Sequence, residues 1–204
     1  MTRKGSALAA SLFLSWREGV TAEGREDGAL RIQGHGPGVV LRRLAPAVAA
    51  ALGRLAPPGA EEDRLAESVR EDGGAAALPE WYYRVQELAR RGLVCRVLKA
   101  GDRRLATLLP ISSGFTFAPA EAAPDRTYQL SRFAYLRREG GGIVLESPLA
   151  HARVLLDDGG AAGLAAALAK PARAHELAGR AGDFPADAVA PLLVLLAAAG
   201  MVED

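Results

Sequence analysis

Hydrophobic and polar positions follow two kinds of spacing in the first part of the chain. Short runs in which apolar residues alternate with polar ones predict β-strands, and longer runs with apolar positions three and four residues apart predict helices. The predicted strands cover residues 10–17, 29–34 and 38–42, and the predicted helices cover residues 46–55, 60–71 and 79–91. Pro79 suits the first turn of the third helix and Gly92 suits its carboxyl-terminal cap. The first part is therefore predicted as three strands followed by three helices.

A β-hairpin is predicted directly after the third helix. Residues 93–98 and 104–109 are apolar runs, and Lys-Ala-Gly-Asp between them supplies the glycine-containing loop of a hairpin. Three small helices followed by a hairpin are the arrangement of a winged helix-turn-helix. Residues 118–127, which are rich in proline and alanine, predict a linker.

The second part of the chain has the same order of predicted elements. Strands are expected at residues 132–138, 143–147 and 152–157, and helices at residues 160–169, 172–181 and 187–199. Because a proline inside a helix loses one hydrogen bond, Pro191 predicts a helix start near Asp187 or a kink. Gly200 again follows the last helix. The hairpin expected after Val202 lies outside the 204 residues, so the second wing is either missing or part of a longer protein.

Five short similarities occur in the same order in both parts and indicate an internal duplication. They relate residues 11–20 to 133–142, 39–41 to 154–156, 55–57 to 169–171, 65–66 to 177–178, and 88–94 to 196–202. The predicted fold class is α+β, with tandem winged helix-turn-helix-like units that each have a small antiparallel sheet and three helices. The units are placed at residues 1–117 and 128–204, joined by the linker.

Charge and hydropathy exclude several classes of partner. The chain has 25 Lys and Arg against 24 Asp and Glu, a net charge of +1, so no long-range field attracts nucleic acid or an anionic membrane. The longest apolar run, residues 189–202, is shorter than the roughly 20 residues of a membrane-spanning helix. The single cysteine, Cys95, excludes an intrachain disulfide and is typical of a reducing compartment, so we expect a cytoplasmic protein.

The sequence supplies no set of residues with catalytic or metal-ligand spacing. His35, His151 and His175 are scattered along the chain, and residues 34–38 (Gly-His-Gly-Pro-Gly) predict a turn, not a phosphate-binding loop. Ser112 lacks the flanking glycine pattern of a nucleophile elbow. We therefore predict no catalytic residue, no cofactor and no metal in this chain.

The predicted fold is suited to binding an extended peptide. An edge strand has unpaired backbone groups that can accept a peptide as an additional strand, and an adjacent helix can supply side-chain selectivity. In the first unit this groove is expected between the third strand and the third helix. The candidate peptide-binding residues are Val39, Val40, Leu41, Arg42, Trp81, Tyr82, Arg84, Val85 and Leu88.

The aromatic run Trp81-Tyr82-Tyr83 lies on the predicted third helix, where three consecutive residues cannot all face one core. At least one of them is therefore expected to be exposed, although Trp81 suits a core position equally well. The corresponding helix of the second unit, residues 187–199, is apolar on every side and predicts burial against another surface. The first unit is thus the better candidate for binding a peptide.

Residues 130–156, followed by the apolar segment ending in Ala-Ala-Ala-Gly-Met-Val-Glu at 197–203, resemble the amino-terminal half of the SagB/ThcOx-type dehydrogenases. These flavin-dependent azoline oxidases help to make thiazole- and oxazole-modified ribosomal peptides. In that family, tandem winged-helix units similar to precursor-peptide recognition elements precede an FMN-binding, nitroreductase-like domain. The resemblance implies that this chain is a recognition region and that FMN belongs to the parent or partner oxidase.

The resemblance also implies the partners: a precursor leader peptide and other modifying enzymes of the pathway, such as a cyclodehydratase. Two other functions remain open. The same topology suits a winged-helix DNA-binding regulator, although the third helix carries Glu80 and Glu87 beside its arginines. The apolar helix at residues 187–199 instead suits a structural module that forms a homodimer.

Overall fold

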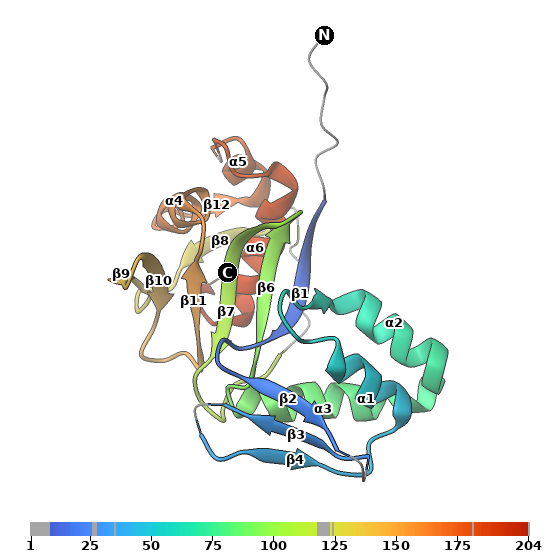
Figure 1. Ribbon diagram of the computed structural model, residues 1–204. Helices are drawn as coiled ribbons and strands as arrows, with labels where there is room; N and C mark the ends of the chain where they lie inside the picture. Colours follow the sequence, from blue (N-terminus) through green and yellow to red (C-terminus); the bar gives the residue numbers. More distant parts are fainter. Residues whose placement is uncertain are drawn as a thin grey trace. The chain divides into compact units, whose positions relative to one another are not determined.

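A computed structural model describes residues 9–25, 28–34, 36–117, 123, 125–180 and 182–203 (Figure 1). The predicted turn at His35 and most of the predicted linker lie outside the described residues. The chain forms two compact units. The N-unit takes its described residues from Phe13–Arg96 and Leu109–Phe117, and the C-unit takes its described residues from Met1–Leu12, Val97–Leu108 and Ala118–Asp204.

The first series of elements runs from β1 to β7. It comprises β1 (Ala10–Trp16), β2 (Thr21–Gly24), β3 (Leu30–Gln33), β4 (Val39–Leu41), α1 (Pro46–Gly53), β5 (Ala60–Glu61), α2 (Glu62–Gly73), a 3-10 turn (Ala75–Ala77), α3 (Leu78–Arg90), β6 (Val94–Ala100) and β7 (Arg103–Pro110). Strands β1, β6 and β7 contribute residues to both units. The hairpin predicted after the third helix is confirmed by β6 and β7, with Gly101 at φ 59° between them.

The second series lies in the C-unit. It comprises β8 (Thr127–Leu130), β9 (Tyr135–Glu139), β10 (Gly142–Glu146), β11 (Ala152–Leu156), α4 (Gly159–Ala167), β12 (Ala172–Arg173), α5 (Ala174–Ala178), a 3-10 turn (Ala186–Ala188), α6 (Val189–Ala198) and β13 (Val202–Glu203). The described residues therefore form an α+β fold with six α-helices and antiparallel strand pairs.

Three sheets are present among the described strands. The largest has the order β5-β1-β6-β7-β11-β10-β9, and two three-stranded sheets have the orders β2-β3-β4 and β12-β8-β13. In the N-unit, β2, β3 and β4 follow one another as a meander (Figure 1). Ile32 opposite Val39, and Leu30 opposite Leu41, face the core, whereas the side chain of Val40 points outward. The sheet is thus buried on one face.

The helices of the N-unit bury one face each. On α3 the buried positions are Trp81, Val85, Leu88 and Ala89, which share one side of the helix because they are separated by four, three and one residues. Trp81 is 1% exposed. Truncation of such a core tryptophan to alanine typically costs about 3–5 kcal/mol, so this side chain fixes α3 in the unit.

The apolar helix α6 is buried in the core of the C-unit. Five of its large apolar side chains, Val189, Leu192, Leu193, Leu195 and Leu196, are each at most 2% exposed. The helix begins at Val189, so Pro191 lies in its first turn, where the missing amide would have no intrahelical partner. The sequence-based expectation of a start near Asp187 is confirmed.

The two series have the same order of elements. Each runs through four strands, a helix, a two-residue strand, a helix, a 3-10 turn, a third helix and a final strand. Backbone hydrogen bonds match as well: Trp16 N donates to Leu55 O and Leu130 N to Leu168 O, both at 2.8 Å. The sheet orders β5-β1-β6 and β12-β8-β13 also correspond. These correspondences support the internal duplication.

One sequence similarity used to infer the duplication is wrong in register. Residues 11–20 were related to residues 133–142, yet β1 corresponds to β8, and the Arg138-Glu139-Gly140 turn corresponds to the β2–β3 turn. The strands β2 and β8 were not predicted. Each has only four residues, and so short an alternation of apolar and polar positions gives a weak signal.

The third helix of each series ends in the same way. In the first series, Gly92 N donates to Ala89 O and Leu93 N donates to Leu88 O, with Gly92 at φ 66°. In the second series, Gly200 N donates to Ala197 O and Met201 N donates to Leu196 O, with Gly200 at φ 71°. This pair of bonds is a Schellman motif, which requires a left-handed residue after the helix. Glycine adopts that conformation without steric cost.

Replacing Gly92 with alanine should therefore destabilise the protein. A side chain in the left-handed region costs on the order of 1 kcal/mol, and the new Cβ would also lie 3.4 Å from Pro110 O. The change is measured as the free energy of unfolding in urea, followed by circular dichroism. Gly53→Ala is the control, because Gly53 lies in α1 with no atom within 4 Å of a new Cβ. Equal stability of the two variants would contradict this role of Gly92.

Candidate functional site

Strand β4 is an outer strand of the three-stranded sheet of the N-unit. It pairs with β3 on one side, and no other described strand pairs with it. Val39 and Leu41 are buried, and Val40 between them is 43% exposed. An outer strand of this kind has backbone donors and acceptors on its second side that can pair with an extended peptide.

A ladder of ion pairs runs along one side of α3. Arg84 lies 3.8 Å from Glu80 and 3.0 Å from Glu87, and Arg91 lies 3.2 Å from the other oxygen of Glu87. The four side chains share one side because they are three or four residues apart. Glu80 accepts a hydrogen bond of 3.3 Å from the Ala45 amide, four residues after the end of β4. We call these four residues the α3 ladder.

A cavity lies where the start of β4 meets the carboxyl-terminal end of α3. Its volume is about 360 Å³, and it is lined by Arg17, Gly36, Pro37, Val39, Arg91, Gly92 and Leu93. Glu80 therefore lies close to the chain after β4, and Arg91 and Val39, the residue that begins β4, line the same cavity. The two ends of the ladder thus lie near the two ends of β4, and we take the surface between strand and ladder as the candidate groove.

The predicted site residues divide between the core and the surface. Five of them are buried and belong to the core of the N-unit: Val39, Leu41, Trp81, Val85 and Leu88. Val40, Arg42 and Tyr82 are exposed, and Arg84 belongs to the α3 ladder. Side chains buried in the core cannot contact a peptide directly, so five of the predicted residues could support a groove only from within the core.

Tyr82 and Tyr83 lie on different sides of α3. The position four residues after Tyr82 is Gln86, which binds the backbone of Phe115 and Phe117 at 2.7 and 2.9 Å. Tyr83 instead precedes Glu87 by four residues, and the Arg84 guanidinium lies 5.4 Å from its ring centroid. Tyr83 is 63% exposed and lies beside the ladder. The sequence-based prediction that an aromatic residue of this run is exposed is confirmed. The predicted site residues included Tyr82, and the structure adds Tyr83, Arg17 and Arg91 as further candidates.

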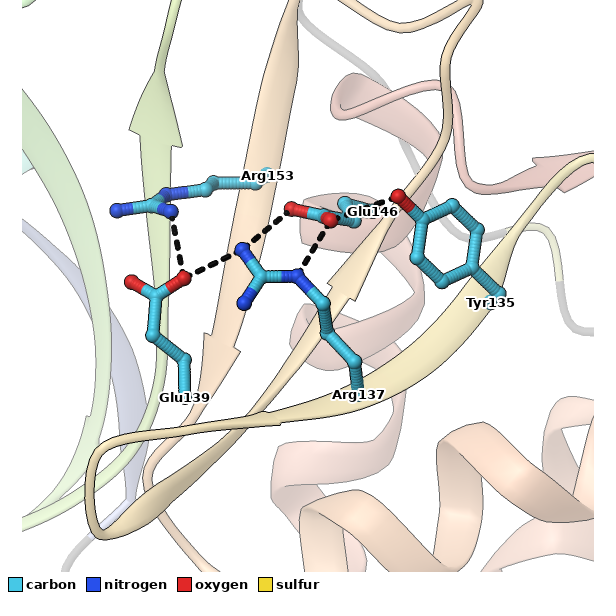
Figure 2. A network of polar contacts seen from close by, with 5 residues as sticks. All are labelled: Tyr135, Arg137, Glu139, Glu146 and Arg153. Atoms are coloured by element: carbon cyan, nitrogen blue, oxygen red, sulfur yellow. Dashed lines mark hydrogen bonds and ion pairs between the residues drawn. The ribbon is translucent and has the colours of Figure 1, made fainter.

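A second polar cluster lies on the β9-β10-β11 sheet of the C-unit (Figure 2). Arg137 on β9 donates to Glu146 on β10 at 2.5 and 3.1 Å and also contacts Glu139. Tyr135 donates to Glu146 at 2.8 Å, and Arg153 on β11 donates to Glu139 at 3.1 Å. Two cations face two anions, so the cluster has no net charge. It joins three strands across one face of the sheet.

The cluster favours the ionised form of Glu146. Hydrogen bonds from Arg137 and Tyr135 hold the pKa of Glu146 below its ordinary value, and the bond to Glu146 raises the pKa of Tyr135. Hydrogen bonds to Glu146 and Glu139 raise the pKa of Arg137. A catalytic acid or base requires a pKa near the working pH, and these shifts lead away from it. We interpret the cluster as structural.

The described residues contain no group of three or more histidine, cysteine or carboxylate side chains placed to hold a metal ion. Within the same residues, no helix has the length and apolar content needed to cross a membrane.

Replacing Glu146 with glutamine should lower stability near neutral pH and have little effect in acid. The pKa of Glu146 is depressed in the folded state. The ionised side chain therefore stabilises the fold at pH values above the ordinary pKa of a glutamate, and this contribution is lost as the pH falls below about 4.3. Urea midpoints measured at pH 7 and pH 3 test this. Glu71→Gln, on an exposed position of α2, controls for the loss of one negative charge. The same difference in urea midpoint between wild type and E146Q at both pH values would contradict this role of Glu146.

Two family models match the chain. The model of the ThcOx helix turn helix domain matches residues 8–118, and the model of the cyanobactin oxidase ThcOx matches residues 128–203. No curated protein matches the sequence. The first match alone spans more than half of the 204 residues, and it contains β4, α3 and the cavity between them. The resemblance drawn from residues 130–156 is confirmed, and the chain belongs to the family of the cyanobactin oxidase ThcOx.

Proposed function

We propose that the N-unit binds the leader segment of a precursor peptide as an additional strand on β4, in the biosynthesis of azole-containing peptides. The observation that supports this most is the unpaired side of β4 next to the α3 ladder. Backbone pairing to β4 would supply affinity that is largely independent of sequence, and the helix side of the groove would supply selectivity. On this proposal, both units are related to precursor-peptide recognition elements.

The groove offers contacts beyond the backbone. Val40 is exposed on the outer face of β4, where a neighbouring strand would place a side chain about 5 Å away. Tyr83 and the aliphatic part of Arg84 offer a surface on the helix side, and the cavity beside Val39 has room for one side chain of the peptide. These contacts are few, and moderate affinity is expected.

We assign the oxidation chemistry implied by the family to FMN held outside these residues. The cavity beside β4 does not fit a flavin. Its described lining includes no aromatic ring against which the flavin ring system could pack. We therefore propose that this chain recognises and docks the precursor peptide for a parent or partner oxidase and for a cyclodehydratase.

The alternative functions receive less support. Arg84 and Arg91 on α3 are paired with Glu80 and Glu87, so they are not available as a basic face for the DNA backbone. The side chains of α6 that suggested a homodimer are buried within the C-unit. The position of α6 removes the reason for that hypothesis.

Addition of the cognate leader peptide should slow amide hydrogen exchange at residues 39–41, because strand addition pairs backbone groups that otherwise exchange with solvent. The measurement is hydrogen–deuterium exchange with mass spectrometry, combined with a fluorescence titration of labelled leader peptide. Peptides from α2 serve as the internal control. The absence of saturable binding, or protection confined to other segments, would exclude the proposal. A gel shift with duplex DNA at low salt tests the regulator alternative.

Tyr83→Ala should weaken leader binding about threefold to tenfold, because exposed aromatic residues beside a groove often carry a large share of the binding energy. Tyr82→Ala is a closely matched control: the two tyrosines are neighbours and are 56% and 63% exposed, but Tyr82 lies on the side of Gln86. The affinity of both variants is measured by fluorescence anisotropy. A larger loss for Y82A would place the peptide on the opposite side of α3.

A further inference from the structure

The C-unit contains a strand corresponding to β4 whose second side is already occupied. In the order of elements, β11 corresponds to β4, and Val154–Leu156 matches Val39–Leu41 in its register with the preceding strand. The sheet order places β7 next to β11. The chain thus pairs one of its own strands with the edge that corresponds to the proposed peptide site.

Charged side chains hold β7 beside the end of β11. Arg103 donates to Asp158 at 2.8 Å, Arg104 lies 3.6 Å from Asp157, and Thr107 donates to Asp157 at 2.6 Å. Asp157 and Asp158 are the first two residues after β11. The added strand is basic at this point, and the two residues that follow the receiving strand β11 are acidic.

The corresponding positions in the N-unit have the opposite charge. The first two residues after β4 are Arg42 and Arg43, and both are exposed. Neither has a hydrogen-bond or ion-pair partner among the described residues, in contrast to the arginines of the α3 ladder. Arg17, which lines the cavity at the other end of β4, likewise has no side-chain partner in the described part of the chain.

Arg43 has an unusual backbone conformation. Its φ of 55° makes it the one described residue other than glycine with a positive φ. This conformation costs on the order of 1 kcal/mol for an ordinary side chain, and such strain is often found at binding sites. The strain is thus located in one of the two residues that carry the reversed charge.

We propose that the edge of β4 selects an acidic peptide segment and that Arg42 and Arg43 recognise its carboxylates. The inference rests on the proposed function and adds to it the chemical class of the peptide. A strand placed on β4 as β7 is placed on β11 would carry acidic residues where β7 carries Arg103 and Arg104. The corresponding edge in the C-unit is paired with β7, so the proposal places one such site among the described strands.

The test uses two synthetic octapeptides with the same neutral fluorophore. One has the sequence of residues 103–110, Arg-Arg-Leu-Ala-Thr-Leu-Leu-Pro, and the other begins with Glu-Glu in place of Arg-Arg. Each is titrated with the full chain at low and at high salt. Two exposed ion pairs contribute modestly, so the wild type should prefer the acidic peptide by about threefold to tenfold at low salt. The preference should shrink at high salt.

The double variant Arg42→Asp, Arg43→Asp reproduces the charges of Asp157 and Asp158 and should prefer the basic peptide. Both positions are exposed, and aspartate tolerates a positive φ better than arginine does, so the fold should persist; circular dichroism checks this. Arg70→Asp, at an exposed position of α2, should keep the preference for the acidic peptide.

Three results would overturn the inference. Equal saturable binding of both peptides by the wild type would exclude charge selection but leave strand addition intact. An unchanged preference in the double variant would assign the selectivity to residues other than Arg42 and Arg43. Failure of the wild type to bind the acidic peptide would exclude the acidic class. In each case, protection of β4 by the cognate leader decides separately whether the proposed function stands.

Discussion

The backbone of a β-strand has hydrogen-bonding groups on two sides, and the outer strand of a sheet leaves one side without a strand partner. The two series of elements in this protein differ in whether that second side pairs with another strand. In the second series, β11 pairs with both β10 and β7. In the first series, β4 pairs with β3, and no other described strand pairs with its second side. The same topology thus yields a completed sheet in one case and a candidate binding edge in the other.

The duplication makes this comparison possible. The two third helices end in the same Schellman motif, with Gly92 and Gly200 at matching positions. The differences between the copies are therefore informative. Helix α6 is almost entirely apolar and buried, whereas α3 carries the ladder from Glu80 to Arg91 on one side and Tyr82 and Tyr83 on its outer surface. The third helix of the second copy thus has the composition of a core element, whereas that of the first copy has charged and aromatic side chains on its surface.

Much of the fold could be predicted from local patterns. The helices of the first copy were placed within about two residues of their observed ends, because Pro79 and Gly92 act on the backbone of their own segment. The prediction was poorest for the short strands. The four residues of β8 were assigned partly to a linker, and the duplication was aligned through Arg-Glu-Gly instead of through the strand pairing that defines it. Pairing partners distant in sequence leave no local signal.

The candidate site was predicted less well than the fold. Periodicity indicated that β4 and α3 carry the groove, but it did not indicate which side of each element is buried, so Trp81 and Leu88 were chosen although they belong to the core. The contribution of Arg17 depends on a cavity formed by three separate segments. The relation between Arg42 and Asp157 likewise appears only when the two copies are compared strand by strand.

The sequence by itself determined the helices, the longer strands, the existence of the duplication and the family, because helix caps, alternation and repeated motifs are properties of contiguous residues. Only the tertiary structure decided which edge is paired and which charges lack a partner. Hydrogen bonds between strands and ion pairs such as Arg103 with Asp158 join residues far apart in the chain, and their formation depends on how the backbone brings those residues together.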